Sequence, residues 1–325
     1  TLVSATVMNP ESLGWTNFFS DQLKDRGAIS NQRPSRVMGM SRTEVTLHDG
    51  NTEFKTSIGG KWFRSQAVEE QPLVGDWVLV DSENKMTRLL NRRNAIQRAH
   101  PYKPGKVQLM AANLDKLLIV ASCNEDYNES RIERFLTLAT SNGIEPVLVL
   151  TKADLTDQGG WYEPRTRALT SCKIYLINAT NDGACEKLQE NLIFGETTAL
   201  IGSSGVGKST IVNSLFKQDI QKTQSVRMSD SKGRHTTTSR SLHILPNGAL
   251  IIDSPGIREI ALADEHVDLA SSFHDILELT RKCRFSNCRH GKEPDCAIQA
   301  AITSGELSPR RLESFLSLSD KNSVD

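Results

Sequence analysis

Long apolar runs and a surplus of one charge are both missing from this chain of 325 residues. No apolar run approaches the length that crosses a lipid bilayer, and the first residues lack the basic, apolar and small-residue pattern of a secretory signal. The 39 Lys and Arg residues are balanced by 39 Asp and Glu residues, so attraction to nucleic acid must come from local patches. We therefore expect a cytoplasmic protein with no membrane partner.

A disulfide framework is also missing, because three of the six cysteines are scattered along the chain. The other three surround a histidine in the pattern Cys283-x4-Cys288-x-His290-x5-Cys296. Three thiolates and one imidazole are the donor set of a closed structural zinc site. The sequence therefore predicts one Zn²⁺ per chain and no open metal position for catalysis. Basic side chains interleave with these ligands and suit phosphate contact: Arg281, Lys282, Arg284, Arg289 and Lys292.

A glycine-rich segment fits the pattern GxxxxGK[ST] of a phosphate-binding loop. Its residues are Gly202, Ser203, Ser204, Gly205, Val206, Gly207, Lys208 and Ser209, followed by Thr210. An apolar run typical of a buried strand precedes the loop, and a helical pattern follows it. Backbone N–H groups and the start of the helix then face the phosphates. We expect Lys208 to reach the β- and γ-phosphates and Ser209 to ligate Mg²⁺.

Two segments at the ends of apolar strands indicate recognition of guanine. Thr151-Lys152-Ala153-Asp154 resembles the NKxD motif of GTPases. Asp154 can accept hydrogen bonds from the N1–H and 2-amino groups of guanine, which adenine does not supply. Thr151 replaces the usual Asn, so one base contact is expected to weaken. Asn178 and Ala179 follow another strand, where GTPases place a backbone contact to the guanine O6 atom.

Two more segments supply the parts of a nucleotide switch. In Gly233-Arg234-His235-Thr236-Thr237-Thr238-Ser239, Thr237 or Thr238 is expected to close over Mg²⁺ and the γ-phosphate. In Asp253-Ser254-Pro255-Gly256, we expect Asp253 to hold Mg²⁺ through water and the N–H of Gly256 to approach the γ-phosphate.

A water-orienting Gln is missing, because Ile257 stands directly after Gly256. An aliphatic side chain cannot orient water, so we expect slow intrinsic hydrolysis that needs another group. His235 and a group supplied by a partner are the two candidates. An ordinary loop role for His235 fits the sequence equally well.

Fully apolar strands alternate with helices from residue 114 onward, which predicts an α/β domain with a parallel sheet covered on both faces. The nucleotide motifs follow an unusual order in it, because the guanine segments precede the phosphate loop. This order indicates a circular permutation, which a fold tolerates when its ends lie close together.

The part of the chain before this domain has a different pattern of apolar and turn-forming residues. Residues 36–93 contain short β segments between Gly, Asn and Asp turns, typical of a small OB-type barrel. Such barrels bind nucleic acid, and a purely structural barrel is the alternative. Residues 84–114 contain seven Lys and Arg and no acid, which suits RNA phosphates, or else a solvated linker. Residues 13–19 predict a short helix that packs its aromatic side chains, either on a partner or on the protein itself.

Together, the permuted motif order, the preceding barrel, the His-Thr-Thr-Thr segment, residues 253–259 and the Cys/His pattern resemble the ribosome small-subunit-dependent GTPases (RsgA/YjeQ). The resemblance covers roughly residues 36–310. It implies a late maturation factor that binds the small ribosomal subunit in its GTP state, contacts rRNA through barrel and zinc knot, and leaves after hydrolysis stimulated by the subunit. The strongly basic tail common in that family is absent from the N-terminal arm.

We expect a monomer with four parts: an N-terminal arm (1–35), an OB-type barrel with a basic linker (36–105), a circularly permuted P-loop GTPase domain (106–268) and a zinc-binding helical domain (269–325). One alternative is an RNA-binding protein that uses GTP mainly as a structural ligand, which Ile257 permits. Another is a small-molecule kinase, against which Asp154 and the barrel argue.

Overall fold

The computed structural model describes residues 9–24, 31–41, 43–58, 62, 70–99, 107–155, 159–178, 185–216, 240–253, 274–285, 288–291, 293–305, 307, 309, 312 and 315–316. The chain divides into two compact units, Thr1–Ala263 and Asp264–Asp325. The predicted boundary between barrel and GTPase lies inside the first unit and remains a prediction.

The first unit is built on one long sheet. Within the described residues, eleven strands join it in the order β10-β9-β8-β11-β13-β12-β1-β2-β3, and β4 and β5 continue from β1. The strands are β1 (Arg33–Met40), β2 (Glu44–His48), β3 (Glu53–Ser57), β4 (Trp77–Val80), β5 (Met86–Leu89), β8 (Lys116–Ser122), β9 (Glu145–Thr151), β10 (Lys173–Ile177), β11 (Thr197–Ile201), β12 (Arg240–Ile244) and β13 (Leu250–Asp253).

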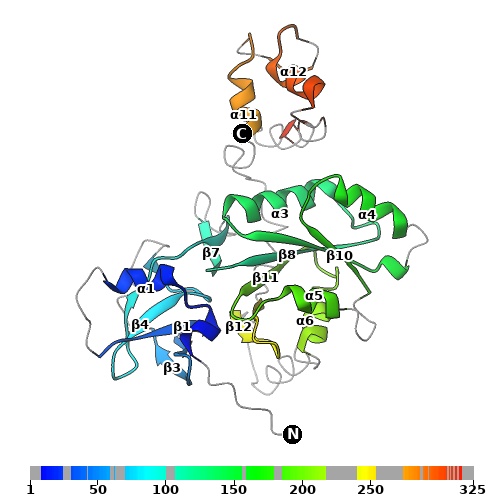
Figure 1. Cartoon of the computed structure of the whole chain (residues 1–325). Helices are drawn as coiled ribbons and strands as arrows, with labels where there is room; N and C mark the ends of the chain where they lie inside the picture. The colour runs from blue at the N-terminus through cyan, green and yellow to red at the C-terminus, as the bar shows by residue number, and fades with distance from the viewer. Residues whose placement is uncertain are drawn as a thin grey trace. The chain divides into compact units, whose positions relative to one another are not determined.

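The strands β10, β9, β8, β11 and β13 run parallel, and β12 is antiparallel to β13. The helices around them are α3 (Glu129–Ser141), α4 (Gly159–Arg167), α5 (Glu186–Asn191) and α6 (Lys208–Phe216). Figure 1 shows α3 and α4 over one face of the sheet and α5 and α6 over the other. Leu117 and Ile119 of β8 pack in the same core as Phe135 of α3, whereas Leu118 and Val120 pack in the core that includes α6. The continuous apolar pattern of these strands therefore follows from burial on both faces, as predicted.

The strands β1 to β5 form the antiparallel part of the sheet, in the order β3-β2-β1-β4-β5. Val37, Val45, Leu47, Val78 and Val80 make a separate small core there. The short β segments predicted for residues 36–93 are thus present as antiparallel strands, and we keep the name barrel for β1 to β5, whose closure remains a prediction.

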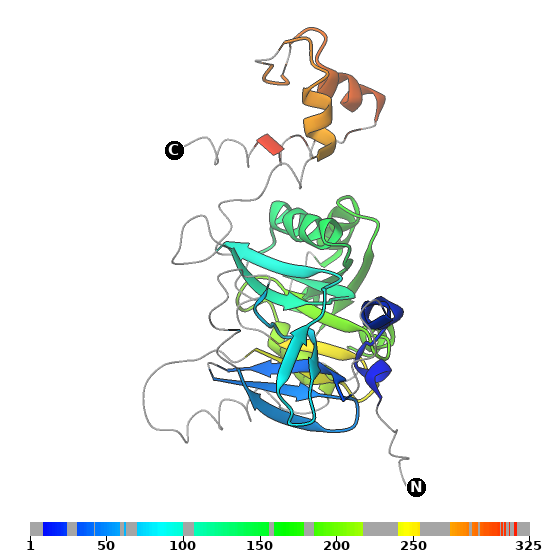
Figure 2. The same ribbon diagram turned by 90° about the vertical axis from the view of Figure 1, so that its left-hand side faces the viewer.

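A direct strand pair links the antiparallel strands β1 to β5 to the part of the sheet that carries the nucleotide motifs. The sequence did not predict this pair. β1 of the barrel pairs with β12, with Gly39 opposite Ser241 and Met40 opposite Arg240. In Figures 1 and 2 the yellow strand β12 lies beside the blue strands of the barrel. The barrel and the nucleotide half are therefore joined by backbone hydrogen bonds as well as by the chain itself.

The N-terminal segment packs on the protein itself. It contains the short helix η1 (Pro10–Leu13) and α1 (Asn17–Lys24). Phe19 is fully buried, and the rings of Trp15 and Phe19 lie 4.8 and 5.9 Å from that of Trp77 on β4. A helix with buried aromatic contacts is thus present as predicted, but it begins at Asn17 and not at Leu13, so Trp15 precedes it. The aromatic contacts support its interpretation as a docking segment.

Basic side chains of the segment 84–114, which contains no acidic residue, form ion pairs within the protein. It contributes the ribbon β6 (Ala95–Ala99) and β7 (Val107–Ala112). Arg92 forms two hydrogen bonds of 2.7 Å with the buried carboxylate of Asp76, and Arg93 pairs with Asp115 at 2.8 Å. Acids from elsewhere in the chain thus pair with Arg92 and Arg93, and RNA contact by this run remains a prediction.

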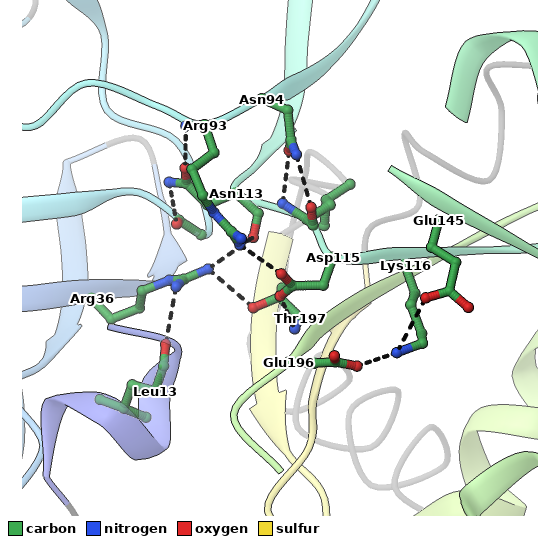
Figure 3. A network of polar contacts seen from close by, with 12 residues as sticks. Leu13, Arg36, Arg93, Asn94, Asn113, Asp115, Lys116, Glu145, Glu196 and Thr197 are labelled. Carbon is green, nitrogen blue, oxygen red and sulfur yellow. Dashed lines mark hydrogen bonds and ion pairs between the residues drawn. The ribbon is translucent and has the colours of Figure 1, made fainter. Parts of the chain in front are cut away.

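A buried arginine sits at the junction of the two halves (Figure 3). Arg36 of β1 is fully buried and donates to the carbonyl of Leu13 at 2.9 Å and to the hydroxyl of Thr197 at 3.1 Å. Burial lowers the pKa of Arg36 to about 9. One side chain thus connects the barrel, the N-terminal segment and the first residue of β11.

The second unit has a small core of its own around α11 (His274–Thr280) and α12 (Ala297–Ser304). The sequence predicted a helix from about 269 to 280, and the described part of that helix begins at His274. The buried side chains of the core of the second unit are Ile276, Cys296, Ile298, Ala301, Leu307, Leu312 and Phe315. Across the described part of both units, no helix has the length and apolar character needed to span a membrane.

Candidate functional site

The predicted phosphate loop connects β11 to α6, as the sequence indicated. Gly202 has a φ of +149°, and a Cβ atom there would lie 2.2 Å from the carbonyl oxygen of Val120. Only glycine fits a position where two backbone segments approach so closely. Gly205 and Gly207 also have positive φ angles, of +77° and +100°. The loop therefore has the curled backbone that phosphate cradling requires.

Lys208, the lysine of the phosphate loop, is buried against the backbone of the loop itself. Lys208 is 5% exposed, and its Nζ atom donates to the carbonyl of Gly202 at 2.6 Å and to that of Ser203. Ser209 and Thr210 follow it in the first turn of α6. A cation and the start of a helix thus share one small region, which favours an anionic ligand.

The predicted guanine motif follows β9 in a tight turn. Lys152 adopts a left-handed backbone with a φ of +59°, and the short helix η3 (Ala153–Leu155) comes next. Asp154 lies exposed in this turn, where its carboxylate is accessible to a ligand. Asn178 comes directly after β10, the strand beside β9.

Thr151 brings the guanine motif and the phosphate loop into direct contact. Its side chain is buried, and its hydroxyl donates to the carbonyl of Val206 at 2.6 Å. The same hydroxyl lies 3.4 Å from the carbonyl of Ala121 on β8. The sequence predicted Thr151 as a base contact, and no local pattern indicated that its partner would lie in the phosphate loop.

The remaining predicted nucleotide residues are only partly described. Asp253 is the last residue of β13, a parallel neighbour of β11, so its backbone lies at the edge of the sheet where the phosphate loop begins. Ala179, His235, Thr237, Thr238 and Gly256 lie outside the described residues.

The predicted metal ligands converge in the second unit. The ligand atoms of Cys283, Cys288, His290 and Cys296 all lie within 4.8 Å of one another. The Nδ1 atom of His290 is 3.6 Å from the Sγ atoms of Cys283 and Cys296, which are 3.9 Å apart. Burial lowers the pKa of His290 and so favours the neutral imidazole that ligates metals. This cluster can hold a metal ion.

Neighbouring residues hold the ligand loop in shape. The carboxylate of Glu293 accepts hydrogen bonds from the backbone N–H groups of Arg289 and Gly291, which flank His290, at 3.1 and 2.7 Å. Gln299 of α12 donates to the carbonyl of His290 at 2.6 Å. The sequence analysis missed these supports, which resemble the outer-shell contacts that orient ligands in other metal sites.

Comparison with known proteins decides the family. The profile of the family described as RsgA GTPase matches residues 89–263, more than half of the chain. The chain belongs to the RsgA GTPase family. Members of this family are GTP hydrolases, so this RsgA GTPase is an enzyme that acts on GTP.

Two curated relatives are similar to this RsgA GTPase over nearly its whole length. It is 41% identical over 307 residues to "Small ribosomal subunit biogenesis GTPase RsgA 2" of Vibrio vulnificus (strain CMCP6), covering 94% of this chain and 86% of the relative. It is 40% identical over 327 residues to "Small ribosomal subunit biogenesis GTPase RsgA" of Mesorhizobium japonicum, covering 98% of this chain and 92% of the relative.

A solved structure supports the fold. YjeQ from Thermotoga maritima matches this RsgA GTPase with a TM-score of 0.65 and 24% identity, covering 90% of this chain and all of that one. YloQ, described as a circularly permuted GTPase, matches with a TM-score of 0.62 and 21% identity, covering 92% and 98%. The predicted circular permutation is confirmed.

Proposed function

We propose that this GTPase is a late maturation factor of the small ribosomal subunit. The observation that carries the proposal is about 40% identity, over nearly the whole chain, to proteins named small ribosomal subunit biogenesis GTPases. In this proposal the protein binds the subunit in its GTP state and leaves after hydrolysis, which the subunit stimulates.

GTP binds between the phosphate loop and the guanine motif. The convergent backbone and Lys208 support a phosphate position at residues 202–210, and exposed Asp154 supports a base position beyond β9. Asn178 and Ala179 would add a backbone contact to the base. Mg²⁺ would be held by Ser209, with Thr237 or Thr238, Asp253 and Gly256 completing the γ-phosphate side. His235 or a group from the subunit would assist the attacking water.

The metal of the second unit is structural Zn²⁺. A tetrahedral zinc ion with Zn–S bonds of about 2.3 Å and Zn–N bonds of about 2.0 Å places sulfur atoms roughly 3.8 Å apart and sulfur and nitrogen roughly 3.5 Å apart. The separations of 3.9 and 3.6 Å in the cluster fit these values. With all four protein ligands engaged, the ion stabilises the fold and takes no part in hydrolysis.

The protein is a cytoplasmic monomer that contacts rRNA through the barrel and the zinc-binding unit. Exposed basic side chains beside the metal ligands support the second contact, among them Arg281, Lys282 and Arg289. Phosphate contacts of this kind are weakened by salt, so binding to the subunit should weaken with ionic strength.

Multiple-turnover GTP hydrolysis with and without purified small subunits tests the proposal. We expect slow turnover by the protein alone and stimulation of at least about tenfold by small subunits, because no Gln follows Gly256. Large subunits are the matched control and should not stimulate. Turnover that small subunits leave unchanged would contradict the proposal and favour an RNA-binding protein that uses GTP as a structural ligand.

A further inference from the structure

The hydroxyl of Thr151 connects the guanine motif (residues 151–154) to the phosphate loop (residues 202–209). Backbone pairing fixes its position, because Thr151 lies opposite Ser122 of β8 and Ile177 of β10. The side chain is 1% exposed and points to the carbonyl oxygen of Val206, 2.6 Å away. The second oxygen near it, that of Ala121, is also an acceptor. Both hydrogen-bond contacts of this hydroxyl therefore require it to act as the donor.

A threonine hydroxyl carries one proton. At 2.6 Å the carbonyl of Val206 is much closer than that of Ala121 at 3.4 Å, so this proton is committed to the phosphate loop. The N7 atom of guanine is an acceptor and needs a donor from the protein, as does O6, which the backbone at Asn178 and Ala179 would contact in the proposed site. A hydroxyl whose proton is already used cannot provide one. Asp154 cannot provide one either, because an ionised carboxylate only accepts hydrogen bonds.

We propose that Thr151 is a positioning residue that braces the phosphate loop, and that the N7 atom of guanine accepts no hydrogen bond from the protein, whereas O6 keeps its contact with residues 178–179. This inference rests on the proposed GTP site and specifies how that site recognises its base. Guanine is selected through its N1–H and 2-amino donors at Asp154. Thr151 contributes to the affinity of every guanine nucleotide equally, because it acts on the loop that all of them share.

The packing around Thr151 supports a brace. A Cβ atom on Gly207 would lie 3.6 Å from both the Oγ1 and Cγ2 atoms of Thr151, so the threonine side chain lies close beneath this part of the loop. Val206 is 2% exposed, so its carbonyl has little access to water. Without the hydroxyl this carbonyl loses its partner, which is costly for a buried acceptor.

The first experiment needs no variant. Equilibrium binding of GTP and of 7-deaza-GTP, which has a C–H group in place of N7, is measured by competition against a fluorescent guanine nucleotide with the full chain and Mg²⁺. We expect the two dissociation constants to agree within about threefold, because no hydrogen bond is lost. A 7-deaza-GTP affinity more than about tenfold below that of GTP, the cost of a lost hydrogen bond to the base, overturns the inference.

The second experiment separates the brace from the base contact. Thr151→Val keeps the shape and removes the donor, and we expect it to weaken GTP and 7-deaza-GTP alike, by about tenfold. Thr151→Ser keeps the hydroxyl and should stay within about threefold of the parent protein. Unchanged affinity in Thr151→Val, or a loss confined to GTP, contradicts the brace. If Thr151→Val does not fold, the comparison of the two nucleotides on the parent protein still decides.

These outcomes are distinct from failure of the proposed function. If the parent protein binds neither GTP nor 7-deaza-GTP, the GTP site itself is refuted. If it binds GTP tightly and 7-deaza-GTP poorly, the GTP site stands and only the inference about Thr151 is lost.

Discussion

At the scale of single residues, the proposed recognition of guanine depends on Asp154. It lies exposed two residues after Lys152, whose backbone is left-handed. A carboxylate in this position selects a ring with two adjacent donors. Asp154 is therefore the residue whose substitution should change which base is bound.

We expect Asp154→Asn to lower the affinity for GTP by about a hundredfold or more and to raise that for xanthosine triphosphate. An amide offers a donor, and xanthine carries a carbonyl where guanine carries its 2-amino group. Nucleotide competition assays measure both changes, with Lys208→Met, which should weaken both nucleotides alike, as the control. An Asp154→Asn protein that prefers GTP over ATP as strongly as the parent protein would show that the base is read elsewhere.

Residues that belong to local motifs could be predicted, and their internal partners could not. The positions in 202–210 and the four metal ligands follow fixed spacings, because neighbouring residues must reach one ligand. The contact from Thr151 to Val206 and that from Arg92 to Asp76 depend on how distant segments meet. The spacing of residues along the sequence does not indicate contacts between such distant segments.

At the scale of secondary-structure elements, a buried ion pair ties the residue directly before β4 to the residues that follow β5. The carboxylate of Asp76 is fully buried, accepts a hydrogen bond from the N–H of Leu73 at 2.8 Å and pairs with Arg92. Burial raises the pKa of Asp76. Without Arg92, the buried carboxylate would lose its hydrogen-bonded counterion and keep only the weaker attraction of Arg36.

We expect Arg92→Met to lower the free energy of unfolding by about 3–5 kcal/mol at neutral pH. The loss should shrink as the pH falls, because protonation of Asp76 removes the unpaired charge and its raised pKa brings that protonation nearer to neutrality. Urea unfolding at several pH values measures this. Lys85→Met, in an exposed pair with Glu83, is the control and should leave stability unchanged. Equal effects of the two substitutions would contradict a buried role for Arg92.

Elements with strong local signals were predicted more accurately than those formed by pairing. The sequence predicted the helix Glu129–Ser141, because its apolar face is periodic and Asn142-Gly143 ends it. The ribbon β6–β7 was interpreted as part of a linker, and β12 was not predicted. Each of these strands is short, and its place depends on a partner strand.

At the scale of the whole molecule, the two units depend on different sources of stability. The first has large apolar cores on both faces of its sheet, whereas the second has one small core around the cysteine and histidine ligands. Small units of this kind often need a metal to fold. Metal removal should therefore act on the second unit alone.

We expect Cys288→Ser to lose the bound zinc, and residues 264–325 to become sensitive to protease while the first unit stays resistant. Metal analysis and limited proteolysis followed by mass spectrometry measure these two effects. Cys172→Ser is the matched control, because Cys172 lies far from the cluster in the sequence and should leave both the zinc content and the digestion pattern unchanged. Retention of one zinc per chain by Cys288→Ser would refute the assignment of Cys288 as a ligand.

The pairing of β1 with β12 has a mechanical consequence for a nucleotide switch. The predicted switch threonines stand just before Arg240 in the sequence, and Arg240 is the residue that pairs with Met40 of the barrel. The downstream end of that segment is thus clamped by the neighbouring strand. In the proposed switch, any rearrangement of the segment before Arg240 would start from a residue already paired with Met40. The strand β1 would then be the fixed part against which the proposed switch moves.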